Sequence, residues 1–66
     1  MTITLNGERR DVAAGTTLGA LIAAVGVRRD GIAVARNEDV VPRATIDATP
    51  LADGDAVEII AAVAGG

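Results

Sequence analysis

Apolar and polar residues alternate at the start of the chain. Ile3 and Leu5 each stand between polar residues, and this two-residue period predicts a half-buried strand. Asn6-Gly7 then provides two residues that tolerate positive φ, as a type I′ hairpin turn requires. A second strand over about residues 8–12 should follow, so the chain is predicted to open with a β-hairpin.

The apolar spacing becomes that of a helix after Gly15. The hydroxyl of Thr16 or Thr17 can cap the helix, and Gly26 can end it in the left-handed conformation. Between these limits one apolar stripe, at i, i+3, i+4 and i+7, is formed by Leu18, Leu21, Ile22 and Val25. This stripe is predicted to face the core.

The second half of the chain has the pattern of further strands. Residues 32–35 are apolar on both faces, which favours a central strand, and residues 37–39 form a turn. Val40-Val41 leads into Pro42, whose missing N–H limits any strand there to a short or edge strand. Residues 43–52 are predicted as loop, with at most one helical turn over about 44–47.

The turn at residues 53–55 is predicted to lead into a last strand over residues 56–63. Within that strand Glu58 and Ile60 share one face, and the opposite face carries Val57, Ile59, Ala61 and Val63. A hairpin, a helix and further strands in this order predict one α+β domain over residues 1–66. Its sheet is mixed, with four to five strands, and one main helix packs on one face. A β-grasp domain requires this arrangement, although the order alone leaves other α+β topologies open.

Composition limits both the core and the chemistry. The 66 residues include no aromatic residue and 14 alanines, so the core depends on 18 Leu, Ile and Val residues, and modest stability is expected. Without Cys or His the chain has no disulfide, thiolate, imidazole base or His/Cys metal site, which excludes most small-enzyme mechanisms. We therefore expect a protein that is not an enzyme, binds no metal and has no permanently bound cofactor. The absence of Cys, of a signal peptide and of a long apolar run predicts a cytoplasmic protein without a membrane partner.

The charged residues also exclude a class of partner. Six arginines are scattered among nine carboxylates, and the net charge is −3. Nucleic-acid-binding modules usually carry a basic stripe and stacking aromatic residues, and this sequence has neither. No nucleic-acid partner is therefore expected, and Arg43 and the pair Asp53/Asp55 are interpreted as turn residues and solvated charges.

The most distinctive chemistry lies at the C-terminal end. Residues 64–66, Ala64-Gly65-Gly66, are predicted to form a flexible tail directly after the last strand, and glycine allows a foreign backbone to approach closely. A free carboxylate is a poor electrophile, and ATP-dependent adenylation would give it a good leaving group. The sequence contains no phosphate-binding glycine loop with lysine, so the Gly66 carboxylate is predicted to be acted on by another protein.

A resemblance to a known protein family is carried by segments 37–43, 51–60 and 62–66, together with Gly15-Thr16-Thr17-Leu18. With these segments the sequence closely resembles the ThiS family of thiamine-biosynthesis sulfur carriers. The resemblance covers nearly the whole chain and implies a ubiquitin-like β-grasp fold. It also implies that an adenylyltransferase of the ThiF type uses ATP to adenylate Gly66, and that sulfur from a cysteine-derived donor replaces AMP to give a thiocarboxylate. Thiazole synthase would then accept this sulfur. In that case Gly65 and Ala64 form the tail, and the acceptor site itself is Gly66.

Two residues are candidates for docking the adenylating partner. If the helix covers one sheet face, Glu58 and Ile60 lie on the open face beside the tail. Two other functions stay open at this stage. One is sulfur carriage for another pathway, as the small subunit of molybdopterin synthase or a ubiquitin-like modifier, and the other is a non-carrier β-grasp binding module, which would not need Gly65 and Gly66.

Overall fold

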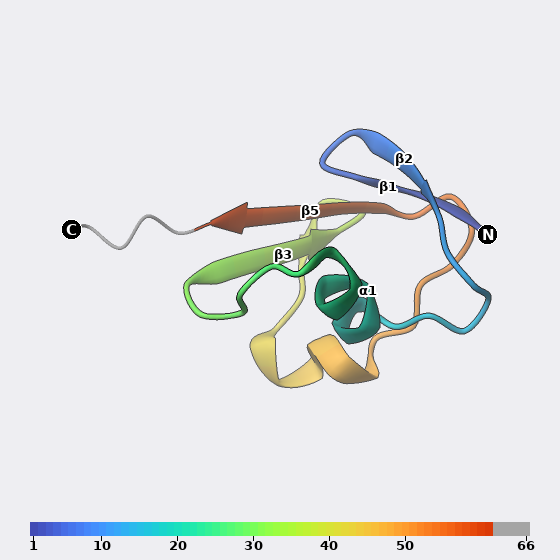
Figure 1. Ribbon diagram of the computed structural model, residues 1–66. Coiled ribbons are helices and arrows are strands. Elements are labelled where there is room, and N and C mark those ends of the chain that lie inside the picture. The colour runs from blue at the N-terminus through green and yellow to red at the C-terminus, as the bar shows by residue number, and fades with distance from the viewer. Residues whose placement is uncertain (62–66) are drawn as a thin grey trace.

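The computed structural model describes residues 1–61, which form a five-stranded sheet with one α-helix and one 3₁₀ helix against one of its faces (Figure 1). In chain order the elements are β1 Thr2–Leu5, β2 Glu8–Asp11, α1 Leu18–Val25, β3 Ile32–Arg36, β4 Asp39–Val40, η1 Arg43–Ala48 and β5 Ala56–Ala61. The strand order across the sheet is β2-β1-β5-β3-β4. Because β1 and β5 are parallel and all other pairs are antiparallel, the sheet is mixed. The predicted α+β β-grasp arrangement is confirmed.

The β1–β2 hairpin forms as the Asn6-Gly7 dipeptide predicts. Both residues have positive φ, 50° at Asn6 and 83° at Gly7, and the register places Leu5 opposite Glu8. Strand β2 ends at Asp11, one residue before the predicted limit of Val12. The backbone of Val12 pairs instead with Met1, donating to its carbonyl at 2.8 Å and accepting from its amino group at 2.7 Å.

Helix α1 has the predicted caps. The Thr17 hydroxyl accepts a hydrogen bond from the Ala20 N–H at 3.1 Å, and Gly26 ends the helix at φ 76°. The predicted apolar stripe faces the sheet, and Val25 lies at its partly buried end. The buried core consists of Ile3, Leu18, Leu21, Ile22, Val34, Ile46, Leu51 and Val57. Full burial of each large aliphatic side chain is worth about 1.5–3 kcal/mol, so these few residues provide most of the hydrophobic stabilisation.

The segment between β3 and β5 is more ordered than the sequence pattern indicates. The turn is tighter than predicted, since Asn37 and Glu38 have positive φ and Asp39 already belongs to the two-residue edge strand β4. Residues 43–48 form the six-residue 3₁₀ helix η1, where the sequence predicts a loop with at most one turn. One buried apolar side chain, Ile46, fixes η1 against α1, and a single residue gives no periodicity to detect.

Strand β5 occupies the middle of the sheet. It pairs with β1 on one side and β3 on the other, whereas β3, the predicted central strand, lies between β5 and the short strand β4. The predicted alternation of faces is confirmed, because Val57 is buried and Glu58 and Ile60 are exposed. The described part of this strand ends at Ala61, so its predicted continuation through Val63 lies outside the described residues.

Candidate functional site

The candidate site begins where β5 ends. The predicted acceptor Gly66 and the predicted tail residues Ala64 and Gly65 all lie outside the described residues. The structure does show how the base of this segment is held. The strand that leads to it is hydrogen-bonded on both sides as far as Ile59 and is anchored in the core by Val57, which is 1% exposed.

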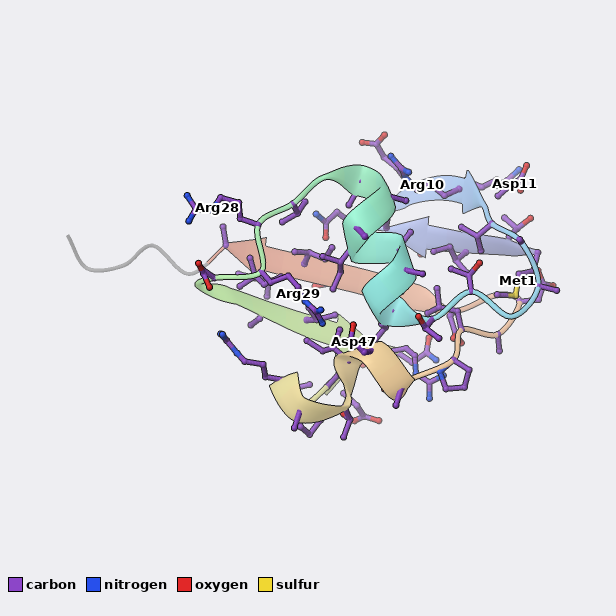
Figure 2. The ribbon with its side chains drawn as sticks, turned by 60° about the horizontal axis from the view of Figure 1, so that its bottom comes forward. Met1, Arg10, Asp11, Arg28, Arg29 and Asp47 are labelled. Atoms are coloured by element: carbon purple, nitrogen blue, oxygen red, sulfur yellow. The ribbon has the colours of Figure 1, made fainter. Side chains whose placement is uncertain are left out.

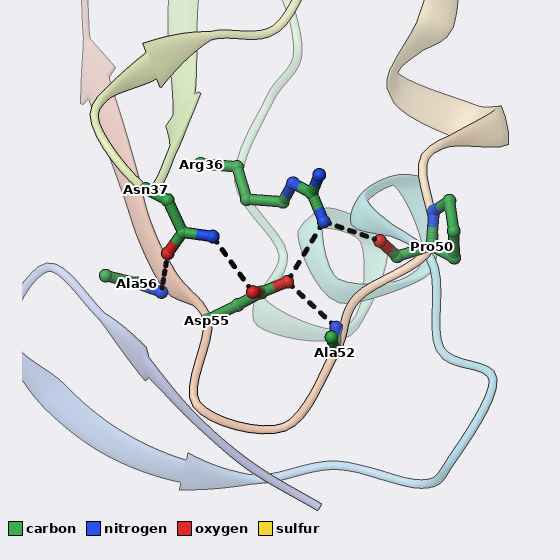
Figure 3. Close-up of polar contacts among 6 residues, drawn as sticks. All are labelled: Arg36, Asn37, Pro50, Ala52, Asp55 and Ala56. Carbon is green, nitrogen blue, oxygen red and sulfur yellow. Dashed lines mark hydrogen bonds and ion pairs between the residues drawn. The ribbon is translucent and has the colours of Figure 1, made fainter.

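A polar network fixes the first residues of β5 to the β3–β4 turn (Figure 3). The carboxylate of Asp55, whose side chain is 9% exposed, accepts hydrogen bonds from the Asn37 side chain at 3.0 Å and from the Ala52 N–H at 2.8 Å. It also pairs with the Arg36 guanidinium at 3.2 Å, and that guanidinium donates to the Pro50 carbonyl. Asp55 therefore ties the turn over residues 50–55 to the end of β3 and the β3–β4 turn, two segments that are far apart in sequence.

The network also determines the protonation of its central carboxylate. Burial alone would raise the pKa of Asp55, but the hydrogen bonds from Asn37 and Ala52 and the charge of Arg36 outweigh it. The net effect holds the pKa of Asp55 below its ordinary value, so the carboxylate is charged at neutral pH. The interpretation of Asp55 as a solvated charge is therefore wrong, because its side chain is enclosed by the turns that it connects.

The other residues interpreted as turn or surface groups fit that description. Asp53 accepts a hydrogen bond from the Thr2 N–H at 2.7 Å and is exposed in the turn before β5. Arg43 is exposed at the start of η1. Sequence reasoning missed Arg36 and Asn37 as partners of Asp55, because nothing in the local pattern brings residue 37 beside residue 55.

The open face of the sheet carries the two predicted docking residues. Ile60 is 56% exposed and stands opposite Ala33 in the register of β3 and β5, while Glu58 stands opposite Ala35. Ala35 in turn pairs with Val40, which is 74% exposed. Because directly paired residues share a face, these side chains form one exposed surface, the open-face patch: Ala33, Ala35, Val40, Glu58 and Ile60.

The patch adds Val40, Ala33 and Ala35 to the residues predicted from sequence. Their grouping depends on the register of three strands, and sequence alone does not provide that register. Figure 1 shows both helical elements, α1 and η1, on the same side of the sheet. The buried residues Val34 and Val57 alternate with the patch residues along β3 and β5, so the patch lies on the opposite side. The predicted placement of Glu58 and Ile60 on the uncovered face is confirmed.

Within residues 1–61 the structure provides no enclosed catalytic chemistry. It shows no pocket there and no group of three acidic side chains placed to hold a metal ion. No helix in this part of the chain is long and apolar enough to cross a membrane. The arrangement is a small sheet that holds the start of a C-terminal segment and exposes an apolar patch beside it.

Comparison with known proteins shows the family to which the chain belongs. A model of the ThiS family matches residues 3–66, nearly the whole chain and including Gly65 and Gly66. The chain belongs to the ThiS family. A crystal structure of the thiamine biosynthesis protein ThiS from Geobacter metallireducens is 35% identical, covers all of both chains and superposes with a TM-score of 0.86. The ubiquitin-like β-grasp fold is thereby established for this ThiS-family chain.

Two curated relatives place the ThiS-family sequence in different contexts. The sulfur carrier protein ThiS from Thermus thermophilus is 40% identical over 62 residues, which are 94% of this chain and 95% of that protein. A thiazole synthase from Paramagnetospirillum magneticum is 38% identical over 66 residues, which are all of this chain and 20% of that protein. This chain thus spans about one fifth of the length of the thiazole synthase that it matches.

Proposed function

We propose that this chain is a sulfur carrier in thiamine biosynthesis and that its Gly66 carboxylate is the site that carries sulfur. The match of the ThiS family through residue 66 is the single observation that carries this proposal. The fold supports it, since the central strand β5 leads to Ala64-Gly65-Gly66 and is braced at its start by Asp55. The chain acts as a co-substrate of its partners and not as an enzyme.

The proposed chemistry has two steps. In the first, a carboxylate oxygen of Gly66 attacks the α-phosphorus of ATP on an adenylyltransferase of the ThiF type, and pyrophosphate leaves. In the second, hydrosulfide released from a cysteine-derived donor attacks the acyl carbon and loses its proton. A C–S bond forms, the C–O bond to AMP breaks, and a thiocarboxylate is left on Gly66.

Thiazole synthase is the proposed acceptor of this sulfur. The proposal is supported by the thiazole synthase from Paramagnetospirillum magneticum, because a fifth of its length aligns with the whole of this chain. A thiazole synthase that includes a region similar to this chain would hold the sulfur carrier beside the acceptor of its sulfur. The other proposed partners, the ThiF-type enzyme and the cysteine-derived sulfur donor, are those that membership of the ThiS family implies. The chemistry supports them, because a carboxylate has to be activated before it can take up sulfur.

The open-face patch is proposed as the surface that docks on the adenylating enzyme, with Ile60 at the end nearer the C-terminal segment and Glu58 beside it. Ile60 lies one residue before the end of the described strand and, within residues 1–61, is the exposed large apolar side chain nearest to Gly66 in sequence. An enzyme that binds the C-terminal segment must also meet the surface at the end of β5. Burial of an exposed aliphatic side chain there adds affinity without enclosing a charge.

The decisive experiment is intact mass spectrometry after incubation with ATP, the adenylating enzyme and a sulfur donor. The expected product has one oxygen replaced by one sulfur, and the change requires ATP. Deletion of Gly66 should abolish the mass change while leaving the fold intact. If the full chain shows no change with a competent enzyme, the sulfur-carrier function is wrong. A non-carrier binding module would retain its activity without Gly65 and Gly66.

A further inference from the structure

The edge of β5 that faces the hairpin is completed by a side chain. Strands β1 and β5 pair in parallel as far as Leu5 and Val57, and the Asn6 N–H donates to the Val57 carbonyl at 2.9 Å. After Asn6 the chain turns away into β2, so no backbone of β1 lies opposite Ile59. The Asn6 side chain pairs with Ile59 instead, because its Oδ1 accepts from the Ile59 N–H at 2.9 Å and its Nδ2 lies 3.4 Å from the Ile59 carbonyl oxygen.

Ala61, the next residue of β5 whose backbone faces the hairpin, has no such substitute. Backbone groups of successive strand residues point to opposite sides, so those of Ile59 and Ala61 point toward the hairpin and those of Ile60 point toward β3. Ala61 stands opposite Ile32 in the register, with its N–H and C=O directed away from β3. Figure 1 shows β5 running past the end of the β1–β2 hairpin, with only β3 beside its last residues. Within residues 1–61 no group pairs with the backbone of Ala61 on that side.

The proposed function brings a protein surface to this position. Five residues separate Ala61 from the end of Gly66, and a fully extended chain of that length spans at most about 18 Å. An enzyme whose active site holds the Gly66 carboxylate therefore surrounds the C-terminal segment close to Ala61. An open strand edge beside a bound extended segment is suited to the addition of a further strand, because main-chain hydrogen bonds require no particular side chains.

We infer that the open edge at Ala61 receives an extended backbone segment of the adenylating enzyme, which adds to β5 where Asn6 ends the ladder with β1. This inference rests on the proposed function and names the contact that aligns the C-terminal segment with the enzyme. Asn6 has two roles in this arrangement. It satisfies Ile59 in the free protein, and it sets the single position at which the added strand begins.

The first test follows amide hydrogen exchange residue by residue in the free chain. The Ile60 amide, paired with β3, should exchange at least about tenfold more slowly than the Ala61 amide. With the adenylating enzyme bound, protection of Ala61 should rise. Equal protection of the two amides in the free chain would show that the edge is closed and overturn the inference. Protection that rises with chain concentration alone would identify a second copy as the occupant and overturn it as well.

The second test removes the donor at the edge. Ala61→Pro lacks only an N–H that points away from β3, and proline is tolerated at such an edge. Ala61→Val keeps the N–H with similar bulk and serves as the matched control. The proline variant should bind the enzyme about fivefold more weakly than the valine variant, as expected for one lost hydrogen bond. Both variants should have the same melting temperature as the parent chain.

The two levels of the proposal fail differently. If the parent chain is adenylated and the proline and valine variants bind equally, the added strand is wrong and the sulfur-carrier function stands. If the parent chain is not adenylated by a competent enzyme, the proposed function is wrong and the inference falls with it.

Discussion

The carboxylate of Asp55, which directly precedes β5, and the guanidinium of Arg36, the last residue of β3, lie 3.2 Å apart. The antiparallel register of β3 and β5 creates this proximity, because it places the last residue of β3 beside the start of β5. Asp55 is almost fully buried and Arg36 is partly exposed, so the carboxylate depends on its partners more than the guanidinium does. The start of the central strand is therefore fixed by a charge.

Substitution of Asp55 should destabilise the fold substantially. Asp55→Ala leaves the Ala52 N–H, the Asn37 amide and the Arg36 guanidinium without their shared acceptor. Loss of one member of a buried charged network costs about 3 kcal/mol. The free energy of unfolding in urea measures this loss. Asp30→Ala is the matched control, because its 3.5 Å pair with Arg28 is highly exposed on both sides, and it should change stability by less than about 1 kcal/mol.

The same carboxylate predicts a dependence of stability on pH. Its pKa in the folded state lies below the ordinary value of 3.8, so the unfolded chain binds this proton more tightly than the folded chain does. The stabilisation is complete above pH 3.8 and is lost as the pH falls from there through the lower pKa of the folded state. The difference in unfolding free energy between the parent chain and Asp55→Ala should therefore shrink below pH 3.8. A difference that stays constant across this range would contradict the lowered pKa.

Gly19 predicts a second packing constraint, between α1 and η1. A Cβ built at this position would overlap the Asp47 carboxylate and lie 3.0 Å from the Asp47 Cα. Alanine is the better helix former, yet Gly19→Ala should destabilise the fold by about 1–3 kcal/mol because η1 has to move away. Thermal unfolding checks the sign. A variant as stable as the parent chain would show that the two helical elements do not need this close approach.

Ala20→Gly is the control for helix propensity at a neighbouring exposed position. It should cost about 0.5–1 kcal/mol with no effect on the packing of η1. The position of η1 can be followed separately through the Arg29–Asp47 ion pair at 2.9 Å, in which the two side chains point toward each other in Figure 2. Gly19→Ala should disrupt this pair, and Ala20→Gly should preserve it.

Local signals in the sequence were sufficient for the elements that depend on local chemistry. The Asn6-Gly7 turn, a threonine cap at residue 16 or 17 and the Gly26 stop each require particular residue types, and the structure has all three, with Thr17 as the cap. The face alternation of β5 was predictable for the same reason, since a two-residue period fixes which side chains point together.

Features that depend on register and tertiary packing could not be predicted locally. Helix η1 is stabilised by one buried residue, Ile46, and the sequence pattern therefore gave only a loop with at most one turn. Asp55 looked like an ordinary turn residue, because its partner Asn37 is 18 positions away. Val40 joined the open-face patch only once the pairing of β3 with β4 was known. In each case the feature depends on a contact between two segments that are distant in sequence, and the residue pattern within one segment does not reveal that contact.

Asn6 gives a prediction for the hairpin edge. Asn6→Gly still permits the positive φ of the turn but removes the amide that pairs with Ile59. The variant should lose about 1 kcal/mol of stability, and the Ile59 amide should exchange faster with solvent. Asn6→Asp keeps an acceptor for the Ile59 N–H and should retain most of the protection. Unchanged exchange in Asn6→Gly would mean that the turn alone holds this edge.

The open-face patch predicts which surface change weakens recognition by the adenylating enzyme. Ile60→Asp places a charge on the exposed surface of β5 at the end of the patch nearer the C-terminal segment, so kcat/KM for adenylation should fall about tenfold. Folding should be unaffected, because Ile60 is 56% exposed and contributes little to the core. Ala20→Asp adds the same charge on the exposed side of α1, in the layer that covers the other face of the sheet, and should leave the rate unchanged. A rate for Ile60→Asp equal to that of the parent chain would remove Ile60 from the docking surface, whereas equal losses in the two variants would point to net charge and not to the patch.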